Sequence, residues 1–449
     1  MKHIIFLLSG CFFFQVSIAQ PTTTMGLFFN SSEAYNGYTL FAPMASTHTY
    51  LIDNCGYVIQ DWQSNYLPGL SVQLLENGYL LRACRLTNST FYGGGSGGRV
   101  ELLDWDSNVV WSYHYSSAEH HQHHDISYLP NGNILLLAWE YKSLEEAEAM
   151  GRQQSIPTSM WPDHIIELAP IGTDDAAIVW EWHVWDHLIQ DVDPSKPNYG
   201  IVAEHPERIN INFDNLGIFT GSDWMHSNAI DYNAELDQIM ISVHHFSEIW
   251  LIDHSTTSEE AASSSGGNSG KGGDLLYRWG NPDAYNRFDG SNRTLYTQHD
   301  AQWIPDNCPD AGKIMVFNNG VNRPEGNYSS IDVIDPPLDI TGDYIIPENT
   351  AIGPNDLFWT YHDDTAFFSD FISSAQRLPT GTTLICEGDD GRFFEVDNTG
   401  NVVWEYISPV SSFGSLSQGQ NPNGNMVFKV SRYPSNYIGL TEQDLNPGS

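Results

Sequence analysis

A strand-like segment that ends in tryptophan recurs six times along the chain. The segments are 58–62, 109–111, 178–180, 275–279, 357–359 and 402–404, ending at Trp62, Trp111, Trp180, Trp279, Trp359 and Trp404. Most of them are preceded by a turn such as Asn131-Gly132 and then an apolar strand. Asn-Gly between apolar runs is a strong hairpin signal, because both turn positions take positive φ. A small β-unit repeated in this way must stack on its neighbours to bury its apolar faces.

Six tryptophan endings predict six repeated sheets. The first segment, 38–62, has no inner strand of its own before it, and the last, 414–433, has no tryptophan ending after it. Pairing the two completes one sheet and removes two open strand edges. We therefore predict an all-β fold, a six-bladed β-propeller closed by pairing of its N- and C-terminal strands. Residues 20–449 form one domain, and only 143–151 reads as a clear short helix.

The first 19 residues have the pattern of a signal peptide. Lys2 and His3 precede an apolar run over 4–16, and Ser17-Ile18-Ala19 supplies small residues for cleavage. This pattern predicts a secreted or periplasmic protein. Lipidation at Cys11 is a less favoured alternative, because the residues after it remain apolar. No later segment is long and apolar enough to span a bilayer.

The charge of the chain excludes several partners. Its 18 Lys and Arg stand against 56 Asp and Glu, a formal net charge of -38. Such a surface repels nucleic acid and anionic membranes. The glycine-rich stretch 266–272 imitates a phosphate-binding loop, but no Ser or Thr follows Lys271 and no helix follows the loop, so no nucleotide site is predicted. The other cysteines, with disulfides and buried thiols both open, are Cys55, Cys84, Cys308 and Cys386.

Histidine recurs at one position of three consecutive repeats. His124, His226 and His299 each lie at the predicted start of an innermost strand, and in two repeats a proline follows six residues later. The other three repeats are predicted to carry Leu70, Ser373 and Leu416 at this position. Because equivalent positions of a closed ring face one another, three imidazoles are expected to meet at the axis. Packing alone does not require that arrangement.

Further polar side chains flank these histidines. His123 precedes His124, Asn228 follows His226 by two residues, and His244 and His245 lie on the predicted second strand of the same repeat. Most of the run 120–124 precedes the predicted strand, so a solvated loop is an alternative. The insertion 182–223 is either a lid over the channel or surface decoration.

Two chemistries fit such a cluster. A neutral imidazole is a nucleophile towards a sulfuryl or phosphoryl group, with its neighbours donating to the oxygens that gain charge. Alternatively, imidazoles bind copper or zinc, and His124, His226, His244 and His299 are then the metal ligands. Both need convergent imidazoles, so spacing does not separate them.

Several segments resemble the bacterial arylsulfate sulfotransferases (the ASST-type arylsulfotransferase family). They are Asp223-Trp224-Met225-His226-Ser227-Asn228 with 239–242, the strand at His124-Asp125, Gln298-His299-Asp300 with 316–320, and the ending 428–440. The similarity covers roughly residues 35–445. It implies a secreted six-bladed propeller that moves a sulfuryl group from an aryl sulfate to a phenol through a sulfohistidine, without a cofactor.

Carried over by motif, the resemblance makes His299 the nucleophile. It implies that His226, Asn228 and His124 hold sulfate oxygens or assist proton transfer. One position departs from the pattern, because His244 stands where the family has arginine. His244 and His123 are then further candidates for substrate binding. The fourth imidazole also favours the metal alternative, and a non-catalytic propeller that binds a glycan or a protein is a third possibility.

Overall fold

The computed structural model describes residues 23–447, except 154–157, 215–220, 290 and 364–365. The predicted signal peptide 1–19 and Cys11 lie outside the described residues. Among the residues described, no helix is long and apolar enough to cross a membrane.

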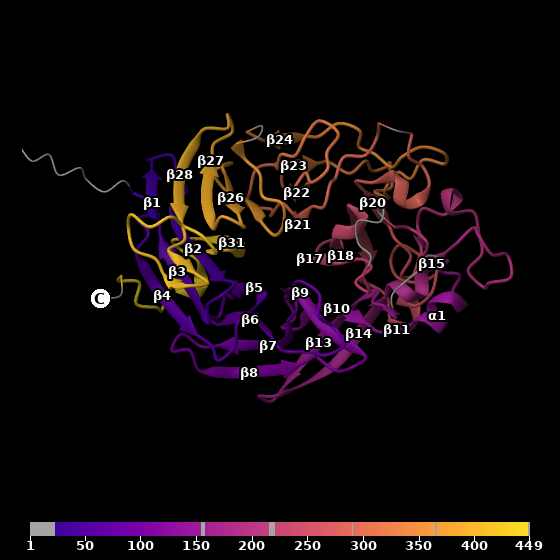
Figure 1. The fold of residues 1–449 in the computed structure, drawn as a ribbon, viewed down its shortest axis with the longest axis horizontal. Coiled ribbons are helices and arrows are strands. Elements are labelled where there is room, and N and C mark those ends of the chain that lie inside the picture. Colours follow the sequence, from indigo (N-terminus) through magenta and orange to yellow (C-terminus); the bar gives the residue numbers. More distant parts are fainter. Residues whose placement is uncertain (1–22, 154–157, 215–220, 290, 364–365, 448–449) are drawn as a thin grey trace, which may run out of the picture.

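Six antiparallel sheets follow one another around a ring (Figure 1). The innermost strands that Figure 1 labels, β31, β5, β9, β17 and β21, surround its centre. Blade 1 contains β31 (Val427–Pro434), β2 (Gly37–Pro43), β3 (His48–Asp53) and β4 (Val58–Gln63). Blade 2 contains β5 (Pro68–Leu74), β6 (Leu80–Arg85), β7 (Gly98–Leu103) and β8 (Val109–His114). Blade 3 contains β9 (His120–Tyr128), β10 (Ile134–Glu140), β13 (Asp163–Ile171) and β14 (Asp175–His183).

The remaining blades follow the same order from the centre outwards. Blade 4 contains β17 (Ser227–Asn233), β18 (Gln238–Val243), β19 (Glu248–Asp253) and β20 (Tyr277–Trp279). Blade 5 contains β21 (His299–Trp303), β22 (Ile314–Asn318), β23 (Ser330–Ile334) and β24 (Trp359–Tyr361). Blade 6 contains β25 (Ser374–Arg377), β26 (Thr383–Glu387), β27 (Arg392–Val396), β28 (Val402–Ile407) and β1 (Gly26–Asn30). The prediction of a six-bladed propeller is confirmed.

The N-terminal segment closes the ring at two places. Strand β2 pairs with β31 in blade 1, where Tyr38 lies opposite Tyr433, and β1 pairs with β28 at the outer edge of blade 6. The predicted C-terminal partner was too long. Within 414–433 only the part from Val427 joins the blade, while β29 (Val410–Ser411) and β30 (Gly414–Ser415) form a separate short hairpin. Leu416, expected on an innermost strand, therefore lies outside every strand.

The six repeated tryptophans all lie on the fourth strand of a blade. Four of them donate the indole N–H to a residue of the neighbouring blade or its loops, which fixes one blade against the next. The pairs are Trp111 with the Asp175 carbonyl, Trp180 with Thr256, Trp279 with the Pro354 carbonyl and Trp404 with the Asn54 carbonyl. The tryptophans that predicted the repeat thus also hold neighbouring blades together.

A second set of contacts joins the blades at the axis. The free edge of each innermost strand has unpaired backbone N–H groups, which need acceptors when buried. At every junction one such N–H donates to a side chain of the adjacent blade. The acceptors and donors are Gln73 Oε1 and Tyr128 N (3.3 Å), Asp125 Oδ2 and Ile230 N (3.2 Å), Asp231 Oδ2 and Trp303 N (2.8 Å), Asp300 Oδ2 and Ala375 N (3.0 Å), Ser374 Oγ and Val430 N (3.2 Å), and Tyr433 Oη and Leu74 N (2.9 Å).

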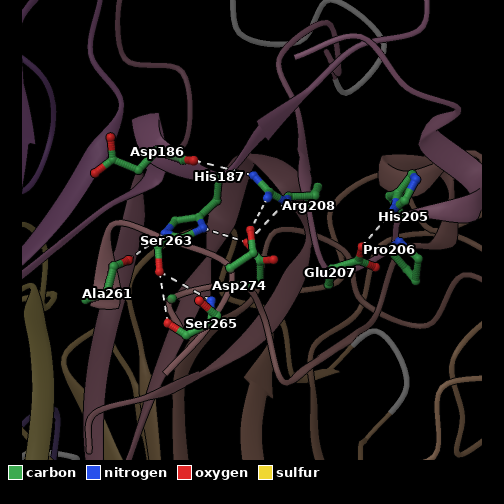
Figure 2. Close-up of polar contacts among 12 residues, drawn as sticks. Asp186, His187, His205, Pro206, Glu207, Arg208, Ala261, Ser263, Ser265 and Asp274 are labelled. Atoms are coloured by element: carbon green, nitrogen blue, oxygen red, sulfur yellow. Dashed lines mark hydrogen bonds and ion pairs between the residues drawn. The ribbon is translucent and has the colours of Figure 1, made fainter. Parts of the chain in front are cut away.

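Two insertions pack against each other beside blades 3 and 4. Figure 2 shows His187 and Arg208 of the insertion 182–223 reaching Asp274, which follows the Ser/Gly-rich stretch 255–273. His187 Nε2 also lies 2.8 Å from the Ala261 carbonyl oxygen, so both ring nitrogens are engaged. The Ser/Gly-rich stretch is not wholly irregular, because it contains a capped helical turn, α2 (Ser258–Ala261).

Short elements complete the insertions. The predicted helix is present as α1 (Leu144–Ala149), with Ser143 and Glu146 forming a capping box at its start. Two short ladders accompany it, β11 (Lys142–Ser143) with β12 (Ser159–Met160) and β15 (Leu188–Ile189) with β16 (Ile209–Asn210). The 3-10 turns are η1 (Val184–His187), η2 (Val202–Glu204), η3 (His244–Phe246), η4 (Pro282–Tyr285) and η6 (Ile438–Leu440). The four cysteines of the described chain are free thiols, three of them buried.

Candidate active site

A cavity of about 490 Å³ lies where the innermost strands begin. One wall is imidazole and the other is apolar. The lining residues are Met44, Leu70, Gly94, Gly95, His124, Gly221, Asp223, His226, His244, His245, His299, Phe371 and Ile372. The insertion 182–223 contributes Gly221 and Asp223, so its end forms part of the wall. Among the described residues that line this cavity there is no Lys or Arg, and Asp223 is the one carboxylate.

The innermost strands bend where they enter the cavity. Leu70, His124, His226 and Ser373 have positive φ values between 51° and 92°, and Asp300, next to His299, has a φ of 52°. Pairing with the second strand shifts register near this point in blades 2, 3, 4 and 5. A bulge re-aims a side chain, and strained non-glycine backbone of this kind concentrates at functional sites. In these blades, the repeated position at the start of the innermost strand therefore lies at a β-bulge.

The four imidazoles of the predicted cluster lie in contact around the cavity. The ring centroids are 4.5 Å apart for His124 and His226, 5.3 Å for His226 and His244, and 5.0 Å for His244 and His299. The structure thus brings together residues from blades 3, 4 and 5 that are far apart in sequence. His124 and His299 are 2% exposed.

His299 is held as a neutral ring with a defined tautomer. Its Nδ1 lies 2.8 Å from Asn319 Oδ1, and the Asn319 amide nitrogen donates to the carbonyls of Ser369 and Ile372. Since the oxygen of Asn319 only accepts, His299 Nδ1 carries the proton and Nε2 keeps its lone pair. Burial lowers the pKa of His299 to about 3. A neutral imidazole with a free Nε2 is the form that attacks an electrophile.

His226 differs from the neighbouring histidines in the direction of its pKa shift. Its Nδ1 lies 2.5 Å from Asp223 Oδ2, and Trp139 donates its indole N–H to the other oxygen of Asp223 at 3.0 Å. Burial alone would lower the pKa of His226, but the Asp223 carboxylate outweighs burial and raises it. His245 stacks on His226 with ring centroids 4.9 Å apart. Asp223 therefore favours the protonated form of His226.

His124 has a second histidine directly behind it. Its Nδ1 lies 2.8 Å from Nδ1 of His123, whose Nε2 lies 3.1 Å from Asp163 Oδ1. His123 does not line the cavity, so the structure does not place it where it would touch a substrate as expected. The run 120–124 is part of β9 and largely buried, so the alternative of a solvated loop is wrong.

Asn228 and His244 are placed differently from what the sequence predicts. Asn228 is fully buried outside the cavity lining, and its Nδ2 donates to the Gln298 carbonyl at 2.8 Å. His244 lines the cavity but begins the turn η3 after β18 instead of lying within that strand. Burial, reinforced by the charges of His299, His245 and His226, holds the pKa of His244 well below its usual value. His244 is therefore a neutral ring where the family pattern has a permanent charge.

The apolar wall comes from the blades without histidine. Leu70 and Ile372 pack with Phe428 of β31, with Met44 and Met426 beside them. Phe428 takes the place predicted for Leu416, and its ring centroid lies 6.1 Å from that of His124 and 6.4 Å from that of His299. An aromatic or aliphatic group next to the imidazoles would contact this wall.

The arrangement does not present a ready metal site. Within the described ranges, no three His, Cys, Asp or Glu side chains converge as metal ligands do. His226 binds Asp223 through Nδ1, which leaves Nε2 as the ring nitrogen that could face a ligand. The set of His124, His226, His244 and His299 is not found as such a group among the described residues, and copper or zinc binding there stays an alternative prediction.

A larger cavity, of about 850 Å³, lies where the innermost strands end. Tyr128, Trp303 and Lys429 are among its lining residues, and none of the clustered histidines is. The Lys429 ammonium lies 2.7 Å from Asp300 and 3.8 Å from Asp125. These groups belong to the strands between the two cavities.

The comparison with known families agrees with this geometry. The profile described as Arylsulfotransferase (ASST) matches residues 46–397. The chain belongs to the arylsulfotransferase family. The resemblance inferred from the histidine motifs is thereby confirmed, and membership implies an arylsulfotransferase-like function with small aryl substrates. No curated protein matches the chain.

Solved structures similar to this arylsulfotransferase family member are distant. A protein of unknown function from Bacteroides caccae is 11% identical with a TM-score of 0.46, covering 89% of this chain and 99% of that one. The periplasmic gluconolactonase PpgL of Pseudomonas aeruginosa is 10% identical with a TM-score of 0.42, covering 88% and 99%. Virginiamycin B lyase from Staphylococcus aureus is 10% identical with a TM-score of 0.38, covering 88% and 87%.

Two residues of the site were not predicted. Asp223 and Asn319 bind Nδ1 of His226 and of His299, and both occur inside motifs that carried the family resemblance. Their signal in the sequence is weak, because an Asp three residues before a histidine and an Asn after a strand are common. Only the closed ring shows that each one reaches a catalytic candidate.

Proposed function

We propose that this protein transfers a sulfuryl group from an aryl sulfate to a phenol, with His299 as the nucleophile. The observation that carries the proposal is the Asn319 contact, which leaves Nε2 of a neutral His299 unprotonated at the edge of the cavity. In the first half-reaction, Nε2 forms a bond to sulfur while the bond from sulfur to the phenolic oxygen breaks. The departing phenolate takes up a proton. The sulfo group then remains on His299.

The second half-reaction reverses these bonds with a new phenol. Its hydroxyl oxygen attacks sulfur, the bond between nitrogen and sulfur breaks, and the hydroxyl proton passes to a base in the site. His226, whose protonated form Asp223 favours, would face the sulfuryl oxygens and stabilise their negative charge. Leu70 and Ile372, on the apolar side of the cavity, would contact the aryl ring.

The test is transfer from 4-nitrophenyl sulfate to phenol. We expect the purified protein to release nitrophenol and form phenyl sulfate, and a His299→Ala variant to lose at least about 1,000-fold in rate. Mass spectrometry of the donor-treated protein, without acceptor, should find the sulfo group on the peptide that contains His299. His205→Ala is the matched control, because His205 is half exposed and bonded to Glu207 away from the cavity. Undiminished transfer by His299→Ala would reject the assignment.

We also propose that the protein acts outside the cytosol, as the signal-like residues 1–19 suggest. An aryl sulfate donor needs no nucleotide, which suits an exported enzyme. Fractionation of expressing bacteria, followed by N-terminal sequencing, tests this. A cytosolic protein that retains Met1 would contradict it.

A further inference from the structure

Behind His124 lies a chain of two hydrogen bonds that ends on a buried carboxylate. His124 Nδ1 and His123 Nδ1 are 2.8 Å apart, and His123 Nε2 is 3.1 Å from Asp163 Oδ1. The other oxygen of Asp163 accepts the backbone N–H of Ser227 at 3.0 Å. Asp163 and His123 are fully buried. The chain therefore runs from the cavity wall into the interior of blade 3.

The geometry limits where the protons can be. A hydrogen bond between two Nδ1 atoms needs one proton, carried by one ring and accepted by the other. Both oxygens of Asp163 accept hydrogen bonds, so its carboxylate faces an N–H of His123. When the shared proton sits on His123, that ring is a cation beside Asp163, and His124 keeps its proton on Nε2. When the shared proton sits on His124, its Nε2 has a lone pair instead.

Neighbouring residues hold the hydrogen bonds of His124, His123 and Asp163 in place and shield them from water. The Trp139 indole stacks on His123 with ring centroids 4.1 Å apart and planes 13° from parallel. The Gly95 carbonyl accepts the backbone N–H of His124 at 2.8 Å. On the cavity side His124 contacts His226, and His244 and His299 line the same cavity.

We propose that His123 and Asp163 form a proton store behind His124, so that His124 protonates the departing phenol and later deprotonates the acceptor. This inference rests on the proposed sulfuryl transfer. In the donor half-reaction, Nε2–H of His124 moves to the phenolate oxygen while the shared proton moves from His123 to His124. In the acceptor half-reaction, the hydroxyl proton moves to Nε2 of His124 and the shared proton returns to His123. One proton leaves the store and one returns in each cycle.

His123 and Asp163 are positioning residues, and the test must separate that role from a structural one. A general acid matters most when the leaving group is basic. We therefore compare kcat/KM for phenyl sulfate and for 4-nitrophenyl sulfate, whose phenolate leaves without protonation. Asp163→Asn should lower the value for phenyl sulfate by about 100-fold and the value for 4-nitrophenyl sulfate by less than about tenfold.

Asp223→Asn provides the contrast. It removes the partner of His226, which holds the sulfuryl oxygens rather than the proton, so both donors should suffer to the same extent. If Asp163→Asn does not fold, His123→Gln replaces it, because glutamine keeps hydrogen-bonding groups but cannot take up a proton. That variant should show the same selective loss.

The outcomes separate the two proposals. Equal losses for the two donors in Asp163→Asn and His123→Gln would overturn the proton store while leaving sulfuryl transfer intact. A wild-type protein that releases phenol from neither donor would instead overturn the proposed function.

Discussion

Asn319 Oδ1 accepts the Nδ1–H of His299 at 2.8 Å and is itself oriented by two backbone carbonyls, of Ser369 and Ile372. The orientation of an amide is set by its hydrogen bonds, and here both amide hydrogens are used. A residue of blade 5 and the loop before blade 6 therefore determine which nitrogen of His299 is free to attack.

Replacing Asn319 should alter catalysis through this tautomer. Asn319→Leu removes the side-chain acceptor of the His299 Nδ1–H, and we expect kcat to fall by about tenfold or more. Asn319→Asp restores an acceptor but adds a negative charge, which raises the pKa of His299 from about 3. The imidazolium cannot attack, so the pH profile of Asn319→Asp should lose its acid side, with activity recovering as pH rises. Steady-state rates between pH 5 and 9 check this, and an unshifted profile would contradict it.

Gly95 packs directly on His124. A Cβ at position 95 would lie 2.1 Å from Cε1 of His124, and Gly95 has a φ of 76°. We expect Gly95→Ala to displace His124 and to abolish most of the transfer activity. Gly312→Ala is the matched control, since Gly312 has a φ of 78° and nothing within 4 Å of its added Cβ. Both variants carry the backbone strain, about 1 kcal/mol of unfolding free energy. Equal activity of the two variants would show that the contact with His124 is unimportant.

The repeated sequence pattern predicts most of the fold for a physical reason. Each tryptophan ending is recognised from a few adjacent residues. The six tryptophans lie on the fourth strands as expected, because the outer strand of a blade packs on its neighbour. The last innermost strand was misplaced because the segment around Leu416 lacks a distinct turn signal. Its true counterpart, Phe428, follows Asn423-Gly424 by four residues. Ring closure joins chain ends, so only long-range pairing settles that register.

The candidate site was predictable in part. The equivalence of His124, His226 and His299 follows from the repeat, because equivalent positions face one axis. The placing of Asn228 and His123 was not predictable, since the bulges of the inner strands decide whether a neighbouring side chain faces the cavity or the interior. A bulge shifts the alternation of side chains by one residue. The spacing of residues within a motif does not reveal that shift.

Metal removal tests the alternative based on copper or zinc. If sulfuryl transfer is the chemistry, dialysis against a chelator should leave the rate unchanged, and elemental analysis should find far less than one equivalent of either metal per chain. Added zinc would compete for the Nε2 lone pair of His299 and should inhibit. A chelator-treated protein that loses activity and regains it with one equivalent of metal would favour the alternative. Chelation followed by re-addition of each metal, with donor turnover as the readout, is the measurement.

Asp231 makes the stability of the propeller depend on pH. Burial raises the pKa of Asp231 to about 6, against the lowering effects of the Trp303 backbone N–H and the Lys429 ammonium. The folded protein therefore binds a proton here between pH 4 and 6 that the unfolded chain has released. The resulting stabilisation is complete below about pH 4 and is lost as pH rises through 6.

Asp231→Asn should remove this dependence. Relative to the wild type, the variant should gain on the order of 2 to 3 kcal/mol in unfolding free energy between pH 4 and pH 7. Denaturant titrations at several pH values measure the difference, and contributions from all other groups cancel. Asp335→Asn, at an exposed carboxylate, controls for the loss of one negative charge. A difference that stays constant from pH 4 to 7 would mean that Asp231 is ionised in the folded state throughout. The Lys429 ammonium would then compensate the Asp231 charge fully, and the strands between the two cavities would carry one more negative charge.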